Sequence, residues 1–208
     1  TRLGFDYYED ILKALKQAYP WIHLKAFTAV EIDFFAQLLG QSHEAILRRL
    51  IDAGLDSMPG GGAEIFHPEI REKICPEKAD ADTWLEIHRI AHRLGLHTNA
   101  TMLYGHLETY AHRIDHMERL RQLQDRTGGF SAFIPLKFKN WNNAMDALPE
   151  VSITEDMRNY AVSRIYLDNI RHLSILDLDC YLGALNGLGA RQLHDIGSHY
   201  LPGHHVIS

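Results

Sequence analysis

The feature that most constrains the fold is a regular alternation of short apolar runs with longer amphipathic segments. Four runs have the composition of short buried strands, at residues 21–27, 54–58, 97–104 and 130–138. Apolar residues recur at helical spacing in the segments around them, at residues 7–19, 31–39, 42–53, 82–94, 109–127 and 152–170. This order predicts an α/β fold with a parallel sheet and helical crossovers, either a (β/α) barrel or a doubly wound sheet.

Charge and cysteine content narrow the class of protein. The 208 residues include 21 Lys and Arg against 27 Asp and Glu, a net charge of −6. This acidity argues against nucleic acid or an anionic membrane as partner, because both select for a basic face. No apolar run reaches the ~20 residues that span a bilayer. Two cysteines cannot build a disulfide framework, so we expect a cytoplasmic protein.

The composition and periodicity of the chain change near its end. Residues 1–173 contain no linker-like stretch and are expected to form one unit, whereas glycines interrupt every candidate helix in residues 174–208. We therefore expect a divergent tail of uncertain structure there. The chain begins at Thr1 without an initiator Met, which suggests a truncated protein.

In a parallel α/β fold the loops that follow the strands carry the chemistry. The most suggestive loop contains Gly60, Gly61 and Gly62, followed by Glu64. Glycines permit close approach of a ligand, and their free N–H groups can hold an anion, although a tight turn with positive φ also requires glycine. Glu64 is suited to bind ribose hydroxyls or an ammonium group, or else to cap the next helix.

A second loop follows the third strand. Gly105 allows a flat ligand to approach, and we expect His106 to face the end of the sheet, where it could donate to a carboxylate or transfer a proton. For Glu108 a structural role is the alternative, since a carboxylate in the first turn of the next helix complements the helix dipole.

Two histidine pairs have metal-compatible spacing, His88 with His92 and His112 with His116. Neither pair belongs to a His-Glu-x-x-His motif, so a solvated helix face is the favoured interpretation and no metal site is predicted. A metallohydrolase remains a distant alternative. Cys75 has no partner motif and is expected to be structural.

Several motifs occur in a familiar order: GLDSMPGGGAEIF, REKICPEK, WLEIHRIAH, NATMLYGHLE, LRQLQDRTGGF and AFIPLKF. Over residues 5–173 the chain closely resembles the aminofutalosine (aminodeoxyfutalosine) synthases, radical S-adenosylmethionine enzymes of the futalosine route to menaquinone. Dehypoxanthine futalosine cyclases and the deazaflavin (FO) synthase subunits share the same framework and are the alternatives within this enzyme class.

The resemblance implies a partial TIM-like barrel of the radical S-adenosylmethionine type. Its cofactors would be S-adenosylmethionine and a 4Fe-4S cluster, with flavodoxin or ferredoxin as electron donor to the intact enzyme. The 5′-deoxyadenosyl radical would add to 3-[(1-carboxyvinyl)oxy]benzoate, and rearrangement with loss of bicarbonate would give aminofutalosine.

The resemblance also implies site residues. Glu64 is the expected ribose acceptor, and Thr101, Tyr104 and Gly105 are expected near adenine, since Thr101-x-Leu103-x-Gly105-x-x-Glu108 is similar to the Gly-x-Ile-x-Gly-x-x-Glu signature of radical enzymes. For the dianionic substrate the expected ligands are Lys25, His106 and the amides of Gly61 and Gly62.

One departure from the family pattern is decisive for the cluster. The Cys-x-x-x-Cys-x-x-Cys motif is absent, and Cys75 and Cys180 alone cannot provide the three thiolates that leave one iron open. We therefore expect a fragment that does not turn over by itself. The alternative from another class is a non-catalytic α/β ligand-binding module.

Overall fold

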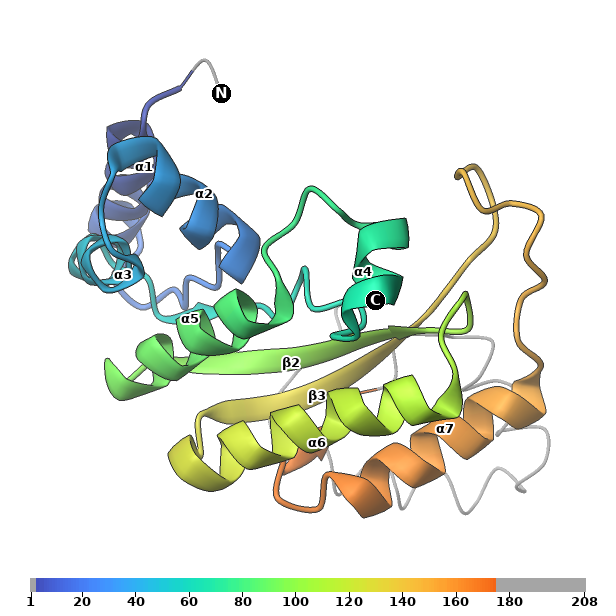
Figure 1. The fold of residues 1–208 in the computed structure, drawn as a ribbon. Coiled ribbons are helices and arrows are strands. Elements are labelled where there is room, and N and C mark those ends of the chain that lie inside the picture. Colours follow the sequence, from blue (N-terminus) through green and yellow to red (C-terminus); the bar gives the residue numbers. More distant parts are fainter. Residues whose placement is uncertain (1–2, 175–208) are drawn as a thin grey trace, which may run out of the picture.

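The computed structural model of the chain describes residues 3–174 (Figure 1). Its helices are α1 Phe5–Ala18, α2 Ala29–Leu39, α3 His43–Asp52, α4 Pro68–Ile74, α5 Ala81–Arg93, α6 Tyr110–Thr127 and α7 Ile153–Tyr166. Its strands are β1 Ser57–Met58, β2 His97–Tyr104, β3 Phe130–Lys137 and β4 His172–Leu173.

The four strands form one parallel sheet in the order β1-β2-β3-β4. Each strand lies beside its neighbour in the sequence, with helices in every connection. A doubly wound sheet reverses its strand order at a switch point, so this order is that of a barrel wall instead. The predicted α/β fold with parallel strands and helical crossovers is confirmed.

The two faces of the sheet have different neighbours. Thr98 contacts His88 of α5, while Tyr104 contacts Arg113 of α6 and Asp156 of α7. Helices therefore cover the face that these two residues share. The alternate residues of β2 and their register partners on β3 lie on the opposite face, here called the inner face: Asn99, Thr101, Leu103, Ala132, Ile134 and Leu136.

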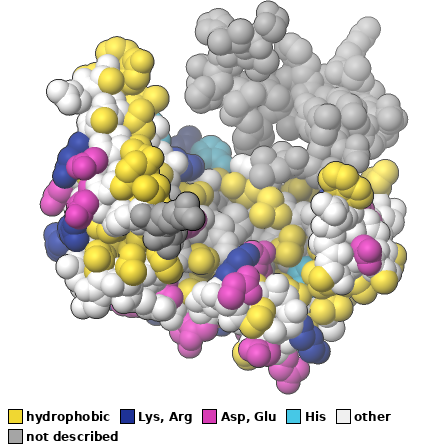
Figure 2. Space-filling view, turned by 90° about the horizontal axis from the view of Figure 1, so that it is seen from above, with side chains coloured by type: hydrophobic (Ala, Val, Ile, Leu, Met, Phe, Trp, Pro, Cys, Tyr) yellow, Lys and Arg dark blue, Asp and Glu magenta, His cyan; other side chains and the backbone are white. Residues whose placement is uncertain are grey.

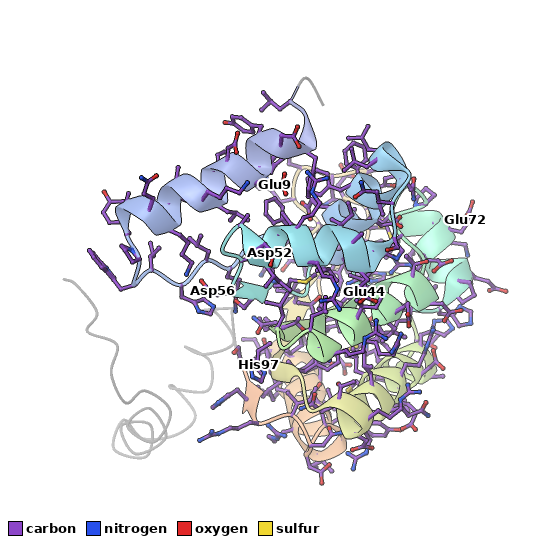
Figure 3. The ribbon with its side chains drawn as sticks, turned by 90° about the vertical axis from the view of Figure 1, so that its left-hand side faces the viewer. Glu9, Glu44, Asp52, Asp56, Glu72 and His97 are labelled. Carbon is purple, nitrogen blue, oxygen red and sulfur yellow. The ribbon has the colours of Figure 1, made fainter. Side chains whose placement is uncertain are left out.

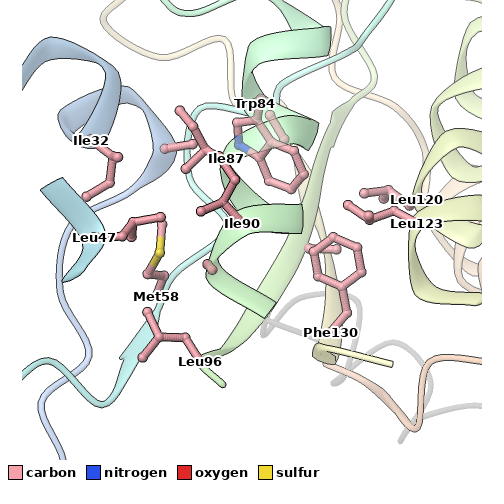
Figure 4. Packing of buried hydrophobic residues seen from close by; sticks show 14 of the residues in the cluster. Ile32, Leu47, Met58, Trp84, Ile87, Ile90, Leu96, Leu120, Leu123 and Phe130 are labelled. Atoms are coloured by element: carbon pink, nitrogen blue, oxygen red, sulfur yellow. The ribbon is translucent and has the colours of Figure 1, made fainter. Parts of the chain in front are cut away.

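The core lies between the sheet and its helices (Figure 4). Trp84 and Ile87 of α5 are fully buried, Met58 of β1 lies beside Leu47, and Leu120 of α6 is buried on the side of Phe130. The helical spacing predicted these inward positions on α5 and α6. Full burial of each such side chain stabilises the fold by about 1.5–3 kcal/mol.

The strand predicted at residues 21–27 is wrong in extent. Only Lys25 makes a β-bridge, to Ser57, and Trp21 is 82% exposed. The side chain of Asp56 accepts a hydrogen bond from the amide of Leu24 at 2.7 Å, in place of a ladder partner. The neighbouring prediction at 54–58 is likewise shortened to the two residues of β1.

Two elements lie outside the predicted set. Helix α4 has seven residues, too few to show helical periodicity, although Pro68 at its start is a common first helical residue. Strand β4 has two residues. Helix α7 begins as predicted, with the Ser152 hydroxyl accepting from the amide of Glu155 at 3.3 Å, but it ends at Tyr166. The predicted divergent tail, beyond Ser174, lies outside the described residues.

Helix α1 has apolar residues on two sides. Phe5 and Leu12 are buried, whereas Tyr7, Ile11 and Leu15 are exposed. Figure 2 shows hydrophobic side chains gathered on this part of the surface. Figure 3 shows Glu9 on the side of α1 toward α3, where it accepts from Arg49 at 2.6 Å. Within residues 3–174 no helix is long and apolar enough to cross a membrane.

Candidate active site

The loops that follow β1 and β2 meet at one edge of the sheet. The Thr101 hydroxyl donates to the carbonyl of Gly60, and the amide of Leu103 donates to the carbonyl of Glu64 at 2.9 Å. A β-carbon added to Gly60 would lie 2.5 Å from the carbonyl oxygen of Asn99. The glycine loop, residues 60–65, is therefore held directly against β2.

The carbonyls of the glycine loop point into the protein. Trp84 Nε1 donates to Gly61 O at 3.1 Å, and the Arg71 guanidinium donates to Gly62 O at 3.2 Å and to Ala63 O at 2.5 Å. The N–H that follows each carbonyl in a trans peptide plane points the opposite way. Among the described residues, no atom accepts from the amides of residues 61–64.

The glycines are also needed for packing. Gly62 has φ +82°, which confirms the turn interpretation at this residue. A β-carbon on Gly61 would lie 2.8 Å from Thr28 Cγ2, and one on Gly62 would lie 2.3 Å from Val30 Cγ2. The start of α2 therefore occupies one side of the loop.

Glu64 pairs with Lys78, with 2.7 Å between Oε1 and Nζ. Burial is the largest single effect and opposes the charge of Lys78, but the hydrogen bond and the charge of Glu64 together with weaker charge effects outweigh it, so the pKa of Lys78 is raised. The N-cap of α4 is His67, which shows that Glu64 does not cap this helix. Its φ of +45° is rare for a residue other than glycine, Asn or Asp, and such strain concentrates at functional sites.

The loop after β2 is closed by Glu108. Its carboxylate accepts from the amides of Gly105 at 2.6 Å and His106 at 2.8 Å, and it pairs with Arg113 at 2.8 Å. Gly105 has φ +91°, and Val151 lies 3.0 Å from the position of an added β-carbon. The Glu108 carboxylate thus binds the amides of its own loop. The residue also lies just before the start of α6, whose dipole it was expected to complement.

His106 is engaged by its own loop. Its Nδ1 accepts from the amide of Leu107 at 2.7 Å, and Nε2 donates to Leu103 O at 3.2 Å. Burial lowers the pKa of His106, and Glu108 opposes this effect only in part. The ring is therefore neutral, with its proton on Nε2.

Tyr104 and Thr101 lie on opposite faces of β2. The Tyr104 hydroxyl donates to Asp156 Oδ1 at 3.0 Å, and Lys137 Nζ donates to Asp156 Oδ2 at 2.8 Å. The side chain of Tyr104 is thus buried among the helices, and only its backbone is near the loops. This buried ion pair was not predicted from the sequence.

Lys25 lies on the inner face, because its register partner Ser57 is one residue from the core residue Met58. The Ser57 hydroxyl is 2.7 Å from Nε2 of His23, which places His23 on the same face. Lys25 and Thr101 thus lie on the inner face of the sheet. The glycine loop and Gly105 lie at the edge where the loops that follow β1 and β2 meet.

Residues 1–120 match the radical SAM superfamily, more than half of the chain. The chain belongs to this superfamily. Its parallel sheet with helical crossovers is the arrangement of the TIM-barrel-like fold of these enzymes.

Three curated relatives of this radical SAM chain illustrate the range of likeness. It is 51% identical over 173 residues to the aminodeoxyfutalosine synthase of Thermus thermophilus, which covers 81% of the chain and 46% of that protein. It is 46% identical over 166 residues to the 5-amino-6-(D-ribitylamino)uracil–L-tyrosine 4-hydroxyphenyl transferase of Methanopyrus kandleri, covering 78% and 45%. It is 40% identical over 170 residues to the cyclic dehypoxanthine futalosine synthase of Streptomyces coelicolor, covering 82% and 43%. The chain thus spans about half the length of these relatives.

The residues of this radical SAM chain do not fit an iron–sulfur cluster. Cys75 is buried against α4, and the sequence contains only one other cysteine. Within residues 3–174 no group of three His, Cys, Asp or Glu side chains could hold a metal ion. The described residues therefore provide no site for the cluster.

The histidine pairs are not solvated faces, as the sequence suggested. His88 and His116 are fully buried, because each points from its helix into the sheet. His116 Nε2 donates to Thr101 O at 2.9 Å, and its Nδ1 accepts from the amide of Phe66 at 3.2 Å. Burial lowers the pKa of His116 to about 3, so the ring is a neutral link between the two loops.

Proposed function

We propose that this chain carries the nucleoside- and substrate-binding loops of an aminodeoxyfutalosine synthase. The observation that supports the proposal is the direct contact between the two loops. Thr101 holds the carbonyl of Gly60 and Leu103 holds that of Glu64, so one ligand can reach both loops at the same sheet edge. The 51% identity to the Thermus thermophilus enzyme supports this choice among the radical SAM activities.

Glu64 is the proposed acceptor for the ribose hydroxyls of S-adenosylmethionine. Carboxylate oxygens accept strong hydrogen bonds from hydroxyl groups, and the contact with Lys78 fixes the position of this carboxylate. The backbone at residues 101–105 is the proposed neighbour of adenine, with Thr101 and Gly105 at its ends and Tyr104 contributing main-chain atoms. When bound and cleaved, S-adenosylmethionine supplies the 5′-deoxyadenosyl group that adds to the substrate.

The proposed substrate, 3-[(1-carboxyvinyl)oxy]benzoate, carries two carboxylates. Lys25 on the inner face and the amides of Gly61 and Gly62, whose preceding carbonyls are held by Thr101 and Trp84, are its proposed partners. His106 is a proposed third partner, and it must release Leu103 O before Nε2 can donate to a carboxylate. The product of the assigned reaction is aminofutalosine.

The wider assignment follows from the same family. Residues 1–173 are the proposed C-terminal part of a radical SAM barrel. A 4Fe-4S cluster, held by cysteines that this chain does not contain, and an electron donor such as flavodoxin or ferredoxin complete the proposed intact enzyme.

A chimera tests the proposed activity. The 173-residue matching segment of the Thermus thermophilus enzyme is replaced by that of this chain, and the purified, cluster-loaded chimera is incubated anaerobically with S-adenosylmethionine, a reductant and the enolpyruvyl benzoate. We expect aminofutalosine by mass spectrometry. A cyclised dehypoxanthine futalosine product from the corresponding substrate would instead favour the cyclase. A folded chimera that binds nucleoside without turnover would favour the non-catalytic binding module.

The role of Glu64 is tested in the 208-residue chain. Calorimetric titration with 5′-deoxyadenosine is expected to show binding that Glu64→Gln weakens about tenfold, the loss of roughly one charge-assisted hydrogen bond. Glu72→Gln is the matched control, since Glu72 is an exposed carboxylate on α4. Equal affinities for the two variants would contradict the ribose contact.

A further inference from the structure

The side chain of Arg71 makes an unusual set of contacts. It is a buried guanidinium on α4, with 6% of its surface exposed. It donates to the carbonyls of Gly62, Ala63 and Ile65 at 3.2, 2.5 and 3.4 Å, and also to that of Ala79. Within residues 3–174 no carboxylate forms an ion pair with it.

Burial of the Arg71 charge without a carboxylate partner is unfavourable for the free energy of folding. A buried charge loses its hydration, and an apolar side chain of similar volume often stabilises a protein equally well. The planar guanidinium, however, presents five N–H donors in a fixed fork, which no other side chain can direct at several carbonyls together. The contacts of Arg71 are therefore specific to the path of the backbone that it holds.

We propose that Arg71 is a positioning residue of the candidate site. It turns the carbonyls of Gly62 and Ala63 away from the ligand, so the amides that follow them, those of Ala63 and Glu64, point toward it. A run of such amides, with φ changing sign at Gly62 and Glu64, forms a concave donor set for an anionic or carbonyl-bearing ligand.

Arg71 also connects the two charged partners of the site. Its contacts to Ala63 O and Ile65 O bracket Glu64, and its contact to Ala79 O holds the residue after Lys78. Both ends of the Glu64–Lys78 pair are thus fixed to the same guanidinium. This inference rests on the proposed function, because it assigns the ligand to Glu64 and the loop amides.

The test compares Arg71→Lys and Arg71→Ala in the 208-residue chain, with Arg89→Ala as control. Arg89 is a half-buried arginine on α5, and within residues 3–174 it forms an ion pair only with Glu86. Two properties are measured: the amide NMR resonances of Ala63 and Glu64, which follow the two carbonyls held by Arg71, and the affinity for 5′-deoxyadenosine. Circular dichroism establishes which variants fold.

We expect Arg71→Lys to remain folded, because the charge and most of the volume are kept, while the Ala63 and Glu64 resonances shift and the affinity falls about tenfold. In Arg71→Ala, millimolar guanidinium chloride is expected to restore the resonances and the affinity, since the ion fits the space vacated by the side chain. Arg89→Ala is expected to change neither property.

A folded Arg71→Lys chain with wild-type resonances and affinity would overturn the inference. If Arg71→Ala does not fold, Arg71→Lys alone decides. If the unsubstituted chain does not bind 5′-deoxyadenosine, the proposed function fails, while the Ala63 and Glu64 resonances still decide whether Arg71 sets the loop.

Discussion

The Nε2 atom of His116 donates a hydrogen bond to the backbone carbonyl of Thr101 over 2.9 Å. The other ring nitrogen accepts from the amide of Phe66, and the ring stacks on the Phe66 side chain with 3.9 Å between centroids. A helix that bears no proposed ligand contact thereby joins the segments that follow β1 and β2. The imidazole can make both contacts only while it is neutral.

This neutrality predicts an acid-sensitive fold. The pKa is lowered by burial to about 3 for His116 and to about 4 for His92. The unfolded chain, with histidine pKa values near 6.5, therefore binds more protons below that pH. We expect the free energy of unfolding to fall as the pH drops from about 6.5 toward 4, by about 1 kcal/mol per pH unit for each histidine.

Urea unfolding at several pH values measures this slope. His116→Gln is expected to reduce the slope by the share of one histidine, since the amide side chain does not titrate. A slope that is identical in the variant and the unsubstituted chain would contradict the assignment.

A directed chain of hydrogen bonds connects two further histidines. The Thr127 hydroxyl donates to Leu123 O, so it accepts from Nδ1 of His92. Nε2 of His92 then accepts from the Thr98 hydroxyl at 2.8 Å, and Thr98 accepts from Nδ1 of His88 at 2.8 Å. The hydroxyl of Thr98 therefore satisfies one nitrogen on each ring.

Thr98→Val removes this hydroxyl while keeping the volume of the side chain. It leaves one buried nitrogen on each histidine without its partner, and each such loss costs about 1–3 kcal/mol. We expect the free energy of unfolding, measured by urea titration, to fall by about 2–4 kcal/mol. Thr154→Val, at an exposed position of α7, is the control and is expected to change it by less than about 0.5 kcal/mol.

Two glycines with similar backbone angles separate strain from crowding. Gly62 has φ +82° with Val30 Cγ2 2.3 Å from an added β-carbon, whereas Gly95 has φ +89° and open space. Gly95→Ala is expected to cost about 1 kcal/mol of unfolding free energy from backbone strain. Gly62→Ala is expected to cost about 1–3 kcal/mol more because of the clash.

The double variant Gly62→Ala with Val30→Ala checks the cause. Removing the valine methyl groups should recover part of the loss, corrected for the cost of Val30→Ala alone, in a double-mutant cycle. Strict additivity of the two substitutions would show that the clash does not decide the cost.

The buried pair of Lys137 and Asp156 provides a fourth prediction. Lys137→Met leaves the Asp156 carboxylate buried with the Tyr104 hydroxyl as its only side-chain partner within residues 3–174, which should cost about 3–5 kcal/mol of unfolding free energy. The double variant Lys137→Met with Asp156→Leu should recover much of this loss, because no charge then remains buried.

The surface pair of Arg89 and Glu86 is the comparison for that experiment. Arg89→Met is expected to cost less than about 1 kcal/mol, since water solvates both charges. Equal losses for Lys137→Met and Arg89→Met, measured by the same denaturant titration, would contradict a buried ion pair.

Sequence periodicity predicted the longer elements well. Helices α5 and α6 and strands β2 and β3 lie within a residue or two of the predicted ranges, because their apolar spacing spans several turns or pleats. The shortest elements, β4 and α4, were not predicted, and β1 is shorter than expected, since two to seven residues carry almost no periodicity.

The candidate site was predictable only in part. The glycine loop and the loop after β2 were found because strand ends precede loops rich in glycine. The contacts of Arg71 and His116 were not, since their partners are backbone carbonyls and amides that carry no residue-specific signal. The prediction that His88 and His116 lie on solvated helix faces was wrong for a different reason. Helical spacing shows that two residues share a face, but it does not show which face the sheet covers.

The sequence by itself therefore determined the parallel α/β architecture, the glycine-containing loops that follow β1 and β2 and the family resemblance, all of which depend on local periodicity and contiguous motifs. Only the tertiary structure decided the faces of the elements. It placed Tyr104 among the helices and Thr101 on the inner face, and it turned the loop carbonyls toward Arg71. These features depend on how distant segments pack, and satisfying buried polar groups across that distance is a property of the whole fold.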